Sequence, residues 1–362
     1  FPKKNIYSPP PPVFQTNRPK IAPPPSNPGG APLHCIAGMK IYLVKRSFFT
    51  FRGQKSYDMD LAGKSCLVRM QENLGAEVVD VPPAGEKLVL YPAYPFLTAE
   101  EVTAFLSAHT ASVRFRGGFL ERGTPFHEED CLSEGLFSLA DYPAMQTRAL
   151  KESGTLHARQ GALVEEGARV DATVRLGRGV VVRRGACITG GSVVGEDAVI
   201  AGDCIIEDSV IGAGTQVTSS RLMASIVGKR CTIGPYATLR PATEVGDDVR
   251  IGSFVECKNA RIGDGSKIAH LAYVGDAELG ARVNVGCGVV FVNFDGRRKS
   301  KSYVGDGAFL GSNCNLVAPV KVGAGSFVAA GTTLTRDLAD GDFCIGRSRE
   351  SIKRRGAEKY LT

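Results

Sequence analysis

The chain lacks tryptophan altogether, and only 7% of its residues are aromatic. It also lacks any apolar run near the roughly 20 residues that a membrane-spanning helix requires, and no secretory signal is visible. Its ten cysteines form neither a CxxC zinc pattern nor a dense disulfide framework, so we expect reduced thiols and a cytoplasmic location. These absences argue against a helical membrane protein and against a small secreted domain held together by disulfides.

Charge and histidine are also sparse. The formal net charge is +7, and much of it lies in the C-terminal stretch SRESIKRRGAEKY, residues 348–360. That stretch is either a solvated tail or a site for anionic ligands. Of the five histidines, only His270 lies beyond residue 160. Glycine is abundant instead, with 43 residues, and this mix suits a coil of short strands joined by many turns.

Composition and hydrophobic patterning divide the chain into four parts. Residues 1–38 contain the runs PPPP and PPP without apolar periodicity, which predicts a disordered tail. Residues 39–150 predict an α/β lobe, with strands at MKIYLV, AEVVDV and KLVLY and a helix in TAEEVTAFLSAH. Thr98 is the candidate N-cap of that helix, and Glu101 lies three positions later. Residues 151–340 are the repeat region, and residues 341–362 are a basic tail.

From residue 164 onward, aliphatic residues recur every six positions. The runs are Val164, Val170, Leu176, Val182, Ile188, Val194, Ile200 and Ile206, then Val227, Ile233, Leu239, Val245, Ile251 and Cys257, then Val304, Leu310, Leu316, Val322, Val328 and Leu334. A period of six fits neither an α-helix nor simple strand alternation. It is typical of a hexapeptide β-helix, in which the aliphatic side chains point inward and three repeats complete a coil. We therefore predict a mainly β fold of roughly nine to ten coils, preceded by a small α/β lobe.

Arg240 and Lys258 interrupt the repeat at positions where glycine prevails. The register between Leu239 and Cys257 is unbroken, so the two cations stack in neighbouring coils about 5 Å apart. Like charges this close repel unless an anion lies beside them. Either both side chains point into solvent and aid solubility, or they bind a phosphoryl group, for which a guanidinium and an ammonium are well suited. We favour the phosphate site.

Two further interruptions lie downstream. Between Phe291 and Val304, the stretch VNFDGRRKSKSY exceeds one repeat and predicts an exposed cationic loop, which serves either solubility or binding. His270 is either a polar surface residue or a general base beside the phosphate site. Zinc binding in the manner of histidine-rich hexapeptide enzymes is disfavoured, because this region supplies a single histidine, and no metal site is predicted.

The most specific motifs are IGPYATLRPATEVGDDVRIGSFVECKNARIGDGSKIAHLAYVGDAELG, followed by NVGCG, NFDG, FLGSNCNLVAPVKVG and VAAGTTLTRD. They resemble the acetyltransferase half of the bacterial bifunctional uridyltransferase/glucosamine-1-phosphate acetyltransferase of UDP-N-acetylglucosamine synthesis, which supplies the cell wall. The close match covers residues 227 to about 347, and a looser one extends back to about 155. The resemblance implies a left-handed β-helix and a homotrimer with sites between the β-helices of neighbouring copies.

The resemblance also assigns roles residue by residue. His270 matches the proton acceptor of the catalytic site, and Glu256 matches an acidic residue that orients a partner there. The residues that match the sugar-phosphate site are Arg240, Lys258, Tyr273, Asn284 and Lys299. Those that match acetyl-CoA contacts are Cys287, Asn293, Phe294, Ser312, Ala330 and Arg347. Phe294 departs from the family because it replaces a tyrosine and loses its hydroxyl, and Cys287 departs because it replaces an alanine whose backbone contacts the cofactor.

The N-terminal lobe departs further from the family. EKLVLYPAYPFLTAEEVTAFLSAH is similar to the central stretch of its nucleotidyltransferase domain, but Pro92 and Ala93 stand where the family has a Gly-Asp pair with the metal-binding aspartate. The glycine-rich nucleotide loop expected near the start of that domain is absent. We interpret residues 39–150 as a reduced nucleotidyltransferase-like lobe without uridyltransferase activity.

The resemblance implies acetyl transfer from acetyl-CoA, a cosubstrate, to the amine of glucosamine 1-phosphate without a metal. Lys353, Arg354 and Arg355 are candidates for the CoA phosphates, although a solvated tail explains them equally well. Two alternatives stay open: an acetyltransferase for another amino-sugar phosphate or nucleotide sugar, and a non-catalytic trimeric scaffold that binds sugar phosphate. A scaffold has no need of a base such as His270, which favours the enzyme. Neither nucleic acid nor membrane is expected as a partner.

Overall fold

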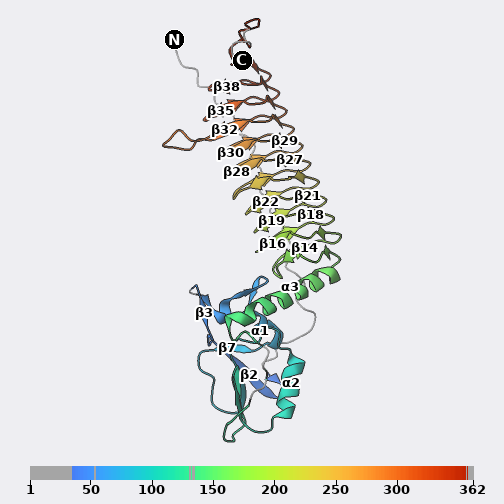
Figure 1. The fold of residues 1–362 in the computed structure, drawn as a ribbon, viewed down its shortest axis with the longest axis vertical. Coiled ribbons are helices and arrows are strands. Elements are labelled where there is room, and N and C mark those ends of the chain that lie inside the picture. Colours follow the sequence, from blue (N-terminus) through green and yellow to red (C-terminus); the bar gives the residue numbers. More distant parts are fainter. Residues whose placement is uncertain (1–34, 53, 130–131, 133–134, 356, 358–362) are drawn as a thin grey trace, which may run out of the picture.

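A computed structural model describes residues 35–52, 54–129, 132, 135–355 and 357. A long coil of short strands is joined to a small lobe through helix α3 (Tyr142–Arg159), as Figure 1 shows. Most of the predicted proline-rich tail lies outside the described residues. The prediction that disorder extends to residue 38 is wrong at its end. Cys35 and Ile36 form strand β1, which pairs with Met39 and Lys40 of β2 (Met39–Val44). Ile36 is buried there, which stabilises the added strand.

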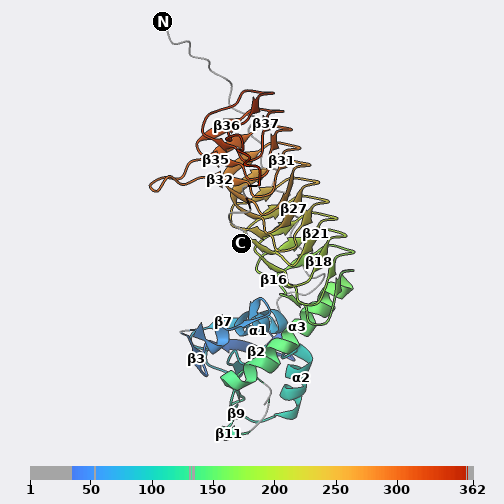
Figure 2. The same cartoon turned by 45° about the horizontal axis from the view of Figure 1, so that its top comes forward.

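Each coil contributes short parallel strands to three faces (Figure 2). The first face consists of β12 Leu163–Val164, β15 Val181–Val182, β18 Val199–Ala201, β21 Gln216–Thr218, β24 Thr232–Ile233, β27 Arg250–Ser253, β29 Lys267–His270, β31 Asn284–Val285, β34 Phe309–Leu310, β37 Phe327–Val328 and β39 Phe343–Cys344. The second consists of β13 Arg169–Val170, β16 Cys187–Thr189, β19 Ile205–Glu207, β22 Arg221–Met223, β25 Thr238–Leu239, β32 Val290–Val292, β35 Asn315–Val317 and β38 Thr333–Leu334. The third consists of β14 Arg175–Leu176, β17 Val193–Val194, β20 Val210–Ile211, β23 Ile226–Val227, β26 Glu244–Val245, β33 Ser302–Val304 and β36 Val320–Val322. Two longer strands, β28 (Glu256–Ile262) and β30 (Tyr273–Leu279), run around the corner from the second face to the third.

The interior of the coil is built from the aliphatic residues of the repeat. From Val170 to Leu334 the repeat positions are buried and form one continuous core. The mainly β hexapeptide solenoid preceded by a small α/β lobe is therefore confirmed. The first face carries eleven strands within the described residues, more than the roughly nine to ten coils expected. One reason is that the coil continues past Leu334: the last strand of this face, β39, lies within the stretch 341–362 that was predicted to be a basic tail. Five inward residues each follow the preceding one after five positions instead of six, which keeps the coil continuous between the runs: Ile211, Leu222, Val227, Ile262 and Leu279.

The lobe is an α/β unit with its own core. Its main sheet consists of β1, β2, β7 Glu77–Val79, β8 Lys87–Leu90, β9 Val113–Phe115, β10 Gly118–Glu121 and β11 His127–Glu128. Around it lie α1 Cys66–Leu74, α2 Ala99–Ala108, the short 3-10 helices η1 Ser56–Asp58 and η2 Leu139–Asp141, and the hairpins β3 Thr50–Phe51 with β4 Gln54–Lys55 and β5 Asp60–Leu61 with β6 Lys64–Ser65. The predicted strands at residues 39–44, 77–79 and 87–90 are confirmed. So is the predicted helix start, because the Glu101 N–H donates to Thr98 Oγ1 over 3.2 Å and the Thr98 N–H donates to Glu101 Oε2 over 2.8 Å.

The lobe is joined to the first coil by backbone contacts. The β5–β6 hairpin reaches that coil, where the Ala172 N–H donates to Ala62 O over 2.8 Å. Gly63 has φ +86°, and a Cβ atom there would come within 2.8 Å of Asp171 Cβ, so both its conformation and the close approach require glycine. Helix α3, which spans the predicted domain boundary at residue 150, packs beneath the same coil through a bond from Ser153 Oγ to Val170 O of 2.8 Å. The lobe thus caps the end of the solenoid, which a stacked repeat requires.

None of the helices in the described ranges is both long and apolar enough to cross a membrane.

Candidate functional site

Four charged side chains meet on the second face of the coil. Leu239 pairs with Cys257 across neighbouring strands, so Arg240 and Lys258 lie one above the other. Arg240 Nη1 is 2.9 Å from Glu256 Oε1. The ammonium of Lys299, which belongs to the loop after β32, lies against that of Lys258 and lowers the pKa of Lys258, and Arg240 lowers it further. The three predicted phosphate-binding cations are therefore neighbours.

The charge of this group is unevenly balanced. Glu256 neutralises Arg240, and its hydrogen bond raises the pKa of that guanidinium. Lys258 and Lys299 face each other, and no ion pair to an acid is formed by either within the described residues. Two adjacent ammonium groups repel each other, and a bound dianion would relieve that repulsion. Around the anion site predicted from stacked Arg240 and Lys258, the unbalanced positive charge therefore lies on Lys258 and Lys299, with Arg240 beside them.

His270 lies at the corner between the first and second faces. It is the last residue of β29, pairs with Ser253 of the coil below and is exposed. Leu271 makes the turn with φ +44°, and Tyr273 then opens β30 beside Glu256. The imidazole and the cation group therefore flank the same stretch of the second face. In the part of the chain that is described, the ring of His270 has no hydrogen-bond partner.

The residues predicted to contact acetyl-CoA continue along the corner of His270. Successive coils are joined there by bonds from the Gly288 N–H to Leu271 O (3.0 Å), the Asn313 N–H to Cys287 O (2.8 Å) and the Gly331 N–H to Ser312 O (2.8 Å). Arg347 Nη1 then donates to Ala330 O over 2.7 Å. Cys287, Ser312, Ala330 and Arg347 are all exposed. These residues lie one coil apart from each other and form an exposed edge of the coil, which starts next to His270.

Tyr273 and Asn293 connect this edge to the cation group. The ring of Tyr273 lies over Gly275, where a Cβ atom would be 2.3 Å from the tyrosine hydroxyl, so a larger residue at position 275 would displace the ring. Asn293 Nδ2 donates to Tyr273 Oη over 3.4 Å and also to Asp276. Asn293 directly follows β32, and the Ser300 N–H donates to its carbonyl over 2.9 Å, which closes the base of the loop that carries Lys299. Figures 1 and 2 show this loop leaving the coil beside β32.

Two predicted site residues remain, one on another face of the coil and one in the protruding loop. Asn284 is on the first face, where β31 pairs Asn284 with Lys267 and Phe309. Phe294 is in the protruding loop, pairs with Lys299 and exposes 53% of its surface. Asp276 and Asn259, which bond to each other over 2.6 Å beside Asn293, were not predicted. Nothing in the sequence pattern distinguishes them, because aspartate and asparagine are common at the turns of the coil.

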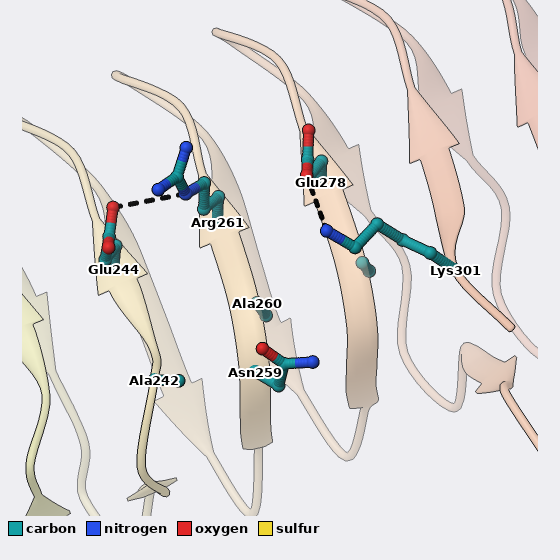
Figure 3. Close-up of a pocket in the computed structure, with 8 residues that line it drawn as sticks. Ala242, Glu244, Asn259, Ala260, Arg261, Glu278 and Lys301 are labelled. Atoms are coloured by element: carbon teal, nitrogen blue, oxygen red, sulfur yellow. Dashed lines mark hydrogen bonds and ion pairs between the residues drawn. The ribbon is translucent and has the colours of Figure 1, made fainter. Parts of the chain in front are cut away.

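A hollow nearby is distinct from the candidate anion site. It measures about 410 Å³ and opens on the third face, and its lining includes Ala242 and Ala260 (Figure 3) as well as Ala277. Its charged walls are already paired, Arg261 with Glu244 over 3.2 Å and Lys301 with Glu278 over 2.7 Å. An anion entering it would compete with these carboxylates, whereas Lys258 and Lys299 offer unpaired charge.

Known proteins are similar to the part of the chain that carries these residues. A family model described as "Bacterial transferase hexapeptide (six repeats)" matches residues 224–259 and 301–336. The bifunctional protein GlmU of Clostridioides difficile strain 630 is 54% identical over 152 residues, which cover 42% of this chain and 33% of the relative. The C-terminal half of the chain is similar to GlmU. GlmU of Shouchella clausii strain KSM-K16 is 52% identical over 145 residues, which cover 40% of this chain and 32% of the relative.

The chain spans about a third of the length of the curated relatives it matches. Among solved structures, the UDP-N-acetylglucosamine acyltransferase of Francisella novicida aligns with a TM-score of 0.37 at 16% identity, over 55% of this chain and 74% of that chain. No conclusion rests on a likeness at that level.

Proposed function

We propose that the protein transfers the acetyl group of acetyl-CoA to the amine of glucosamine 1-phosphate, as a step of UDP-N-acetylglucosamine synthesis. The observation that carries the proposal is the juxtaposition of an exposed histidine, an unbalanced cation group and an open edge of candidate donor contacts. The similarity of the C-terminal half to GlmU supports it.

The proposed chemistry follows from these positions. An ammonium has no lone pair, so the substrate reacts as the neutral amine, after it has given one proton to solvent. His270 accepts the second proton from the nitrogen as the new C–N bond forms. The C–S bond then breaks, and the CoA sulfur leaves as a thiolate that takes up the proton from the His270 imidazolium. Lys258, Lys299 and Arg240 hold the phosphate so that the amine faces the thioester carbonyl. Every step is proton or acyl transfer, so we propose that no metal takes part.

A thiol-release assay tests the proposal. Purified protein with acetyl-CoA and a panel of amino-sugar phosphates and nucleotide sugars should release CoA fastest with glucosamine 1-phosphate, and chelator should leave the rate unchanged. A higher kcat/KM with another amino sugar would mean that this sugar, and not glucosamine 1-phosphate, is the acceptor, while the protein would still be an acetyltransferase. No release with any acceptor, together with measurable binding of sugar phosphate, would support a scaffold instead.

We further propose that the lobe does not catalyse uridyl transfer. Uridyltransferases hold Mg²⁺ and the triphosphate with carboxylates and a glycine-rich loop. Here Ala93, three residues after the end of β8, stands where the metal-binding aspartate is expected. It is fully buried, and its carbonyl accepts a hydrogen bond from the Leu136 N–H over 2.6 Å. Protein supplied with UTP, Mg²⁺ and N-acetylglucosamine 1-phosphate should release no pyrophosphate above a control without enzyme. UDP-N-acetylglucosamine that scales with protein concentration would contradict this.

The assembly we propose is a homotrimer, and an exposed apolar ridge supports contacts between copies. Tyr236, Phe254 and Leu271 stack along the corner below His270, exposed by 60%, 60% and 59%. Their φ values of +61°, +59° and +44° are unfavourable for bulky side chains, so the ridge costs stability in an isolated chain. Asn284, on another face from Arg240, can join the same sugar phosphate only if a second copy presents it.

Light scattering checks the assembly. We expect a mass three times that of the chain, and a smaller mass for Tyr236→Ser combined with Phe254→Ser, because the ridge then loses its two rings. Ile226→Ser, which removes an exposed apolar side chain from the third face, is the matched control and should keep the trimer. A wild-type protein that is monomeric at micromolar concentration would overturn this assembly.

A further inference from the structure

Asn259, Asp276 and Asn293 form a hydrogen-bonded ladder across three successive coils. Asn259 Nδ2 donates to Asp276 Oδ1 over 2.6 Å, and Asn293 Nδ2 donates to Asp276 Oδ2 over 2.5 Å. Asp276 and Asn259 have φ values of +48° and +47° at the corner between the second and third faces, a conformation that Asp and Asn tolerate better than most residues. The corner thereby holds the carboxylate between the two amides.

The carboxylate decides which way each amide turns. An ionised carboxylate only accepts hydrogen bonds, whereas an asparagine amide donates through nitrogen and accepts through oxygen. Both asparagines must therefore turn their nitrogen toward Asp276. Asn293 Nδ2 also lies 3.4 Å from Tyr273 Oη, on the side of the cation group. The carbonyl oxygen Oδ1 of Asn293 is left without a hydrogen-bond donor from the described residues.

We propose that Asp276 is a positioning residue, which fixes the amide of Asn293 so that Oδ1 faces the acyl donor as a hydrogen-bond acceptor. The inference rests on the proposed function and on the contact between Asn293 and acetyl-CoA that the resemblance implies. The complementary group on the ligand is an N–H, which the amides of the pantetheine arm supply. Without Asp276, the Asn293 amide can take either of two orientations of nearly the same shape. In the wrong one its NH2 group, a donor, faces the N–H donor of the ligand.

A second role for Asp276 must be separated from this one. Its carboxylate is among the charges that act on Lys258 and favours the ammonium form of that lysine. If this were its main contribution, removal of the charge would weaken the sugar-phosphate site. If it positions Asn293, removal weakens the acyl-donor site instead. The two KM values therefore distinguish the roles.

The decisive experiment exchanges the donor and the acceptor. Asp276→Asn should raise the KM for acetyl-CoA, and the Kd of CoA measured by calorimetry, about tenfold, with the KM for the sugar phosphate within twofold of the wild-type value. Asp276→Asn combined with Asn293→Asp restores the bond with its direction reversed and still presents an acceptor oxygen to the ligand. This double variant should return both values to within about threefold of wild type. Asn315→Ala, which removes a 3.3 Å amide bond to Thr333 on the same face, is the control and should change neither.

Each result has one meaning. A double variant no better than Asp276→Asn overturns the acceptor role, and a rise confined to the KM of the sugar phosphate assigns Asp276 to Lys258. If the wild type binds CoA but transfers no acetyl group, the proposed function fails while the Kd values still test the ladder. If the wild type binds no CoA, Asn293 is not a donor contact and the inference falls with it.

Discussion

His270→Ala should lower turnover at least a hundredfold and leave the thermal melting temperature almost unchanged. The turnover falls because the substrate amine loses its proton acceptor, and general base assistance typically contributes about 10²–10⁴ in rate. Stability is spared because the ring is exposed and has no hydrogen-bond partner in the described part of the chain. Exposed substitutions of this kind usually change the free energy of unfolding by less than about 0.5 kcal/mol.

Two measurements make the His270 prediction specific. Initial rates at saturating acetyl-CoA and sugar phosphate report kcat, and added imidazole should restore part of it, because the exposed corner leaves room for a free base. His127→Ala is the control, since this histidine of the lobe is also exposed, and its Nε2 makes a 3.3 Å hydrogen bond to Glu129 Oε2. Near-normal turnover of His270→Ala would remove the histidine from the mechanism, and a large fall in melting temperature would mean that the ring has a structural role.

Arg240→Ala should raise the KM for the sugar phosphate about ten- to a hundredfold, with a much smaller change in the KM for acetyl-CoA. A charge-assisted hydrogen bond to phosphate contributes roughly 1.5–3 kcal/mol, which corresponds to this range. The substitution also removes the partner of Glu256. In the wild type the Glu256 carboxylate is 2.9 Å from Arg240, and in the variant its uncompensated negative charge would repel the phosphate. The predicted loss therefore has two parts, a missing bond and an uncovered negative charge.

A double variant separates those parts. Arg240→Ala combined with Glu256→Gln removes the uncovered charge, so any rise in KM that persists belongs to the lost contact between Arg240 and phosphate. Arg221→Ala removes a cation from the same face one coil below Thr238 and should leave both KM values unchanged. If Arg240→Ala raises the KM for acetyl-CoA instead, the two anionic ligands have been assigned to the wrong sites.

Much of the fold was predictable because the repeat is a local property. An aliphatic residue every six positions determines which side chains point inward, and Val170, Ile200 and Leu239 are buried as that period requires. The helix that begins at Thr98 was equally predictable, since a capping box involves residues only three apart. The resemblance in residues 227–347 named candidate site residues, but it could not place them on particular faces of the coil.

Contacts between neighbouring coils depend on the length of each turn, and only the tertiary structure decided them. Five-residue repeats at Ile262 and Leu279 shift the register, so that Asp276 comes to lie between two amides and Asn284 lies on a different face from Arg240. The pairing of Glu256 with Arg240 moves the unbalanced charge to Lys258 and Lys299, and it depends on a contact between coils 16 residues apart along the chain. The sequence by itself therefore determined the β-helix and its inward residues, because each repeat specifies its own side-chain direction. Which charges and amides become neighbours was decided only by the stacking of the coils. The lengths of all three turns of a coil together determine which residue of the next coil lies above a given side chain.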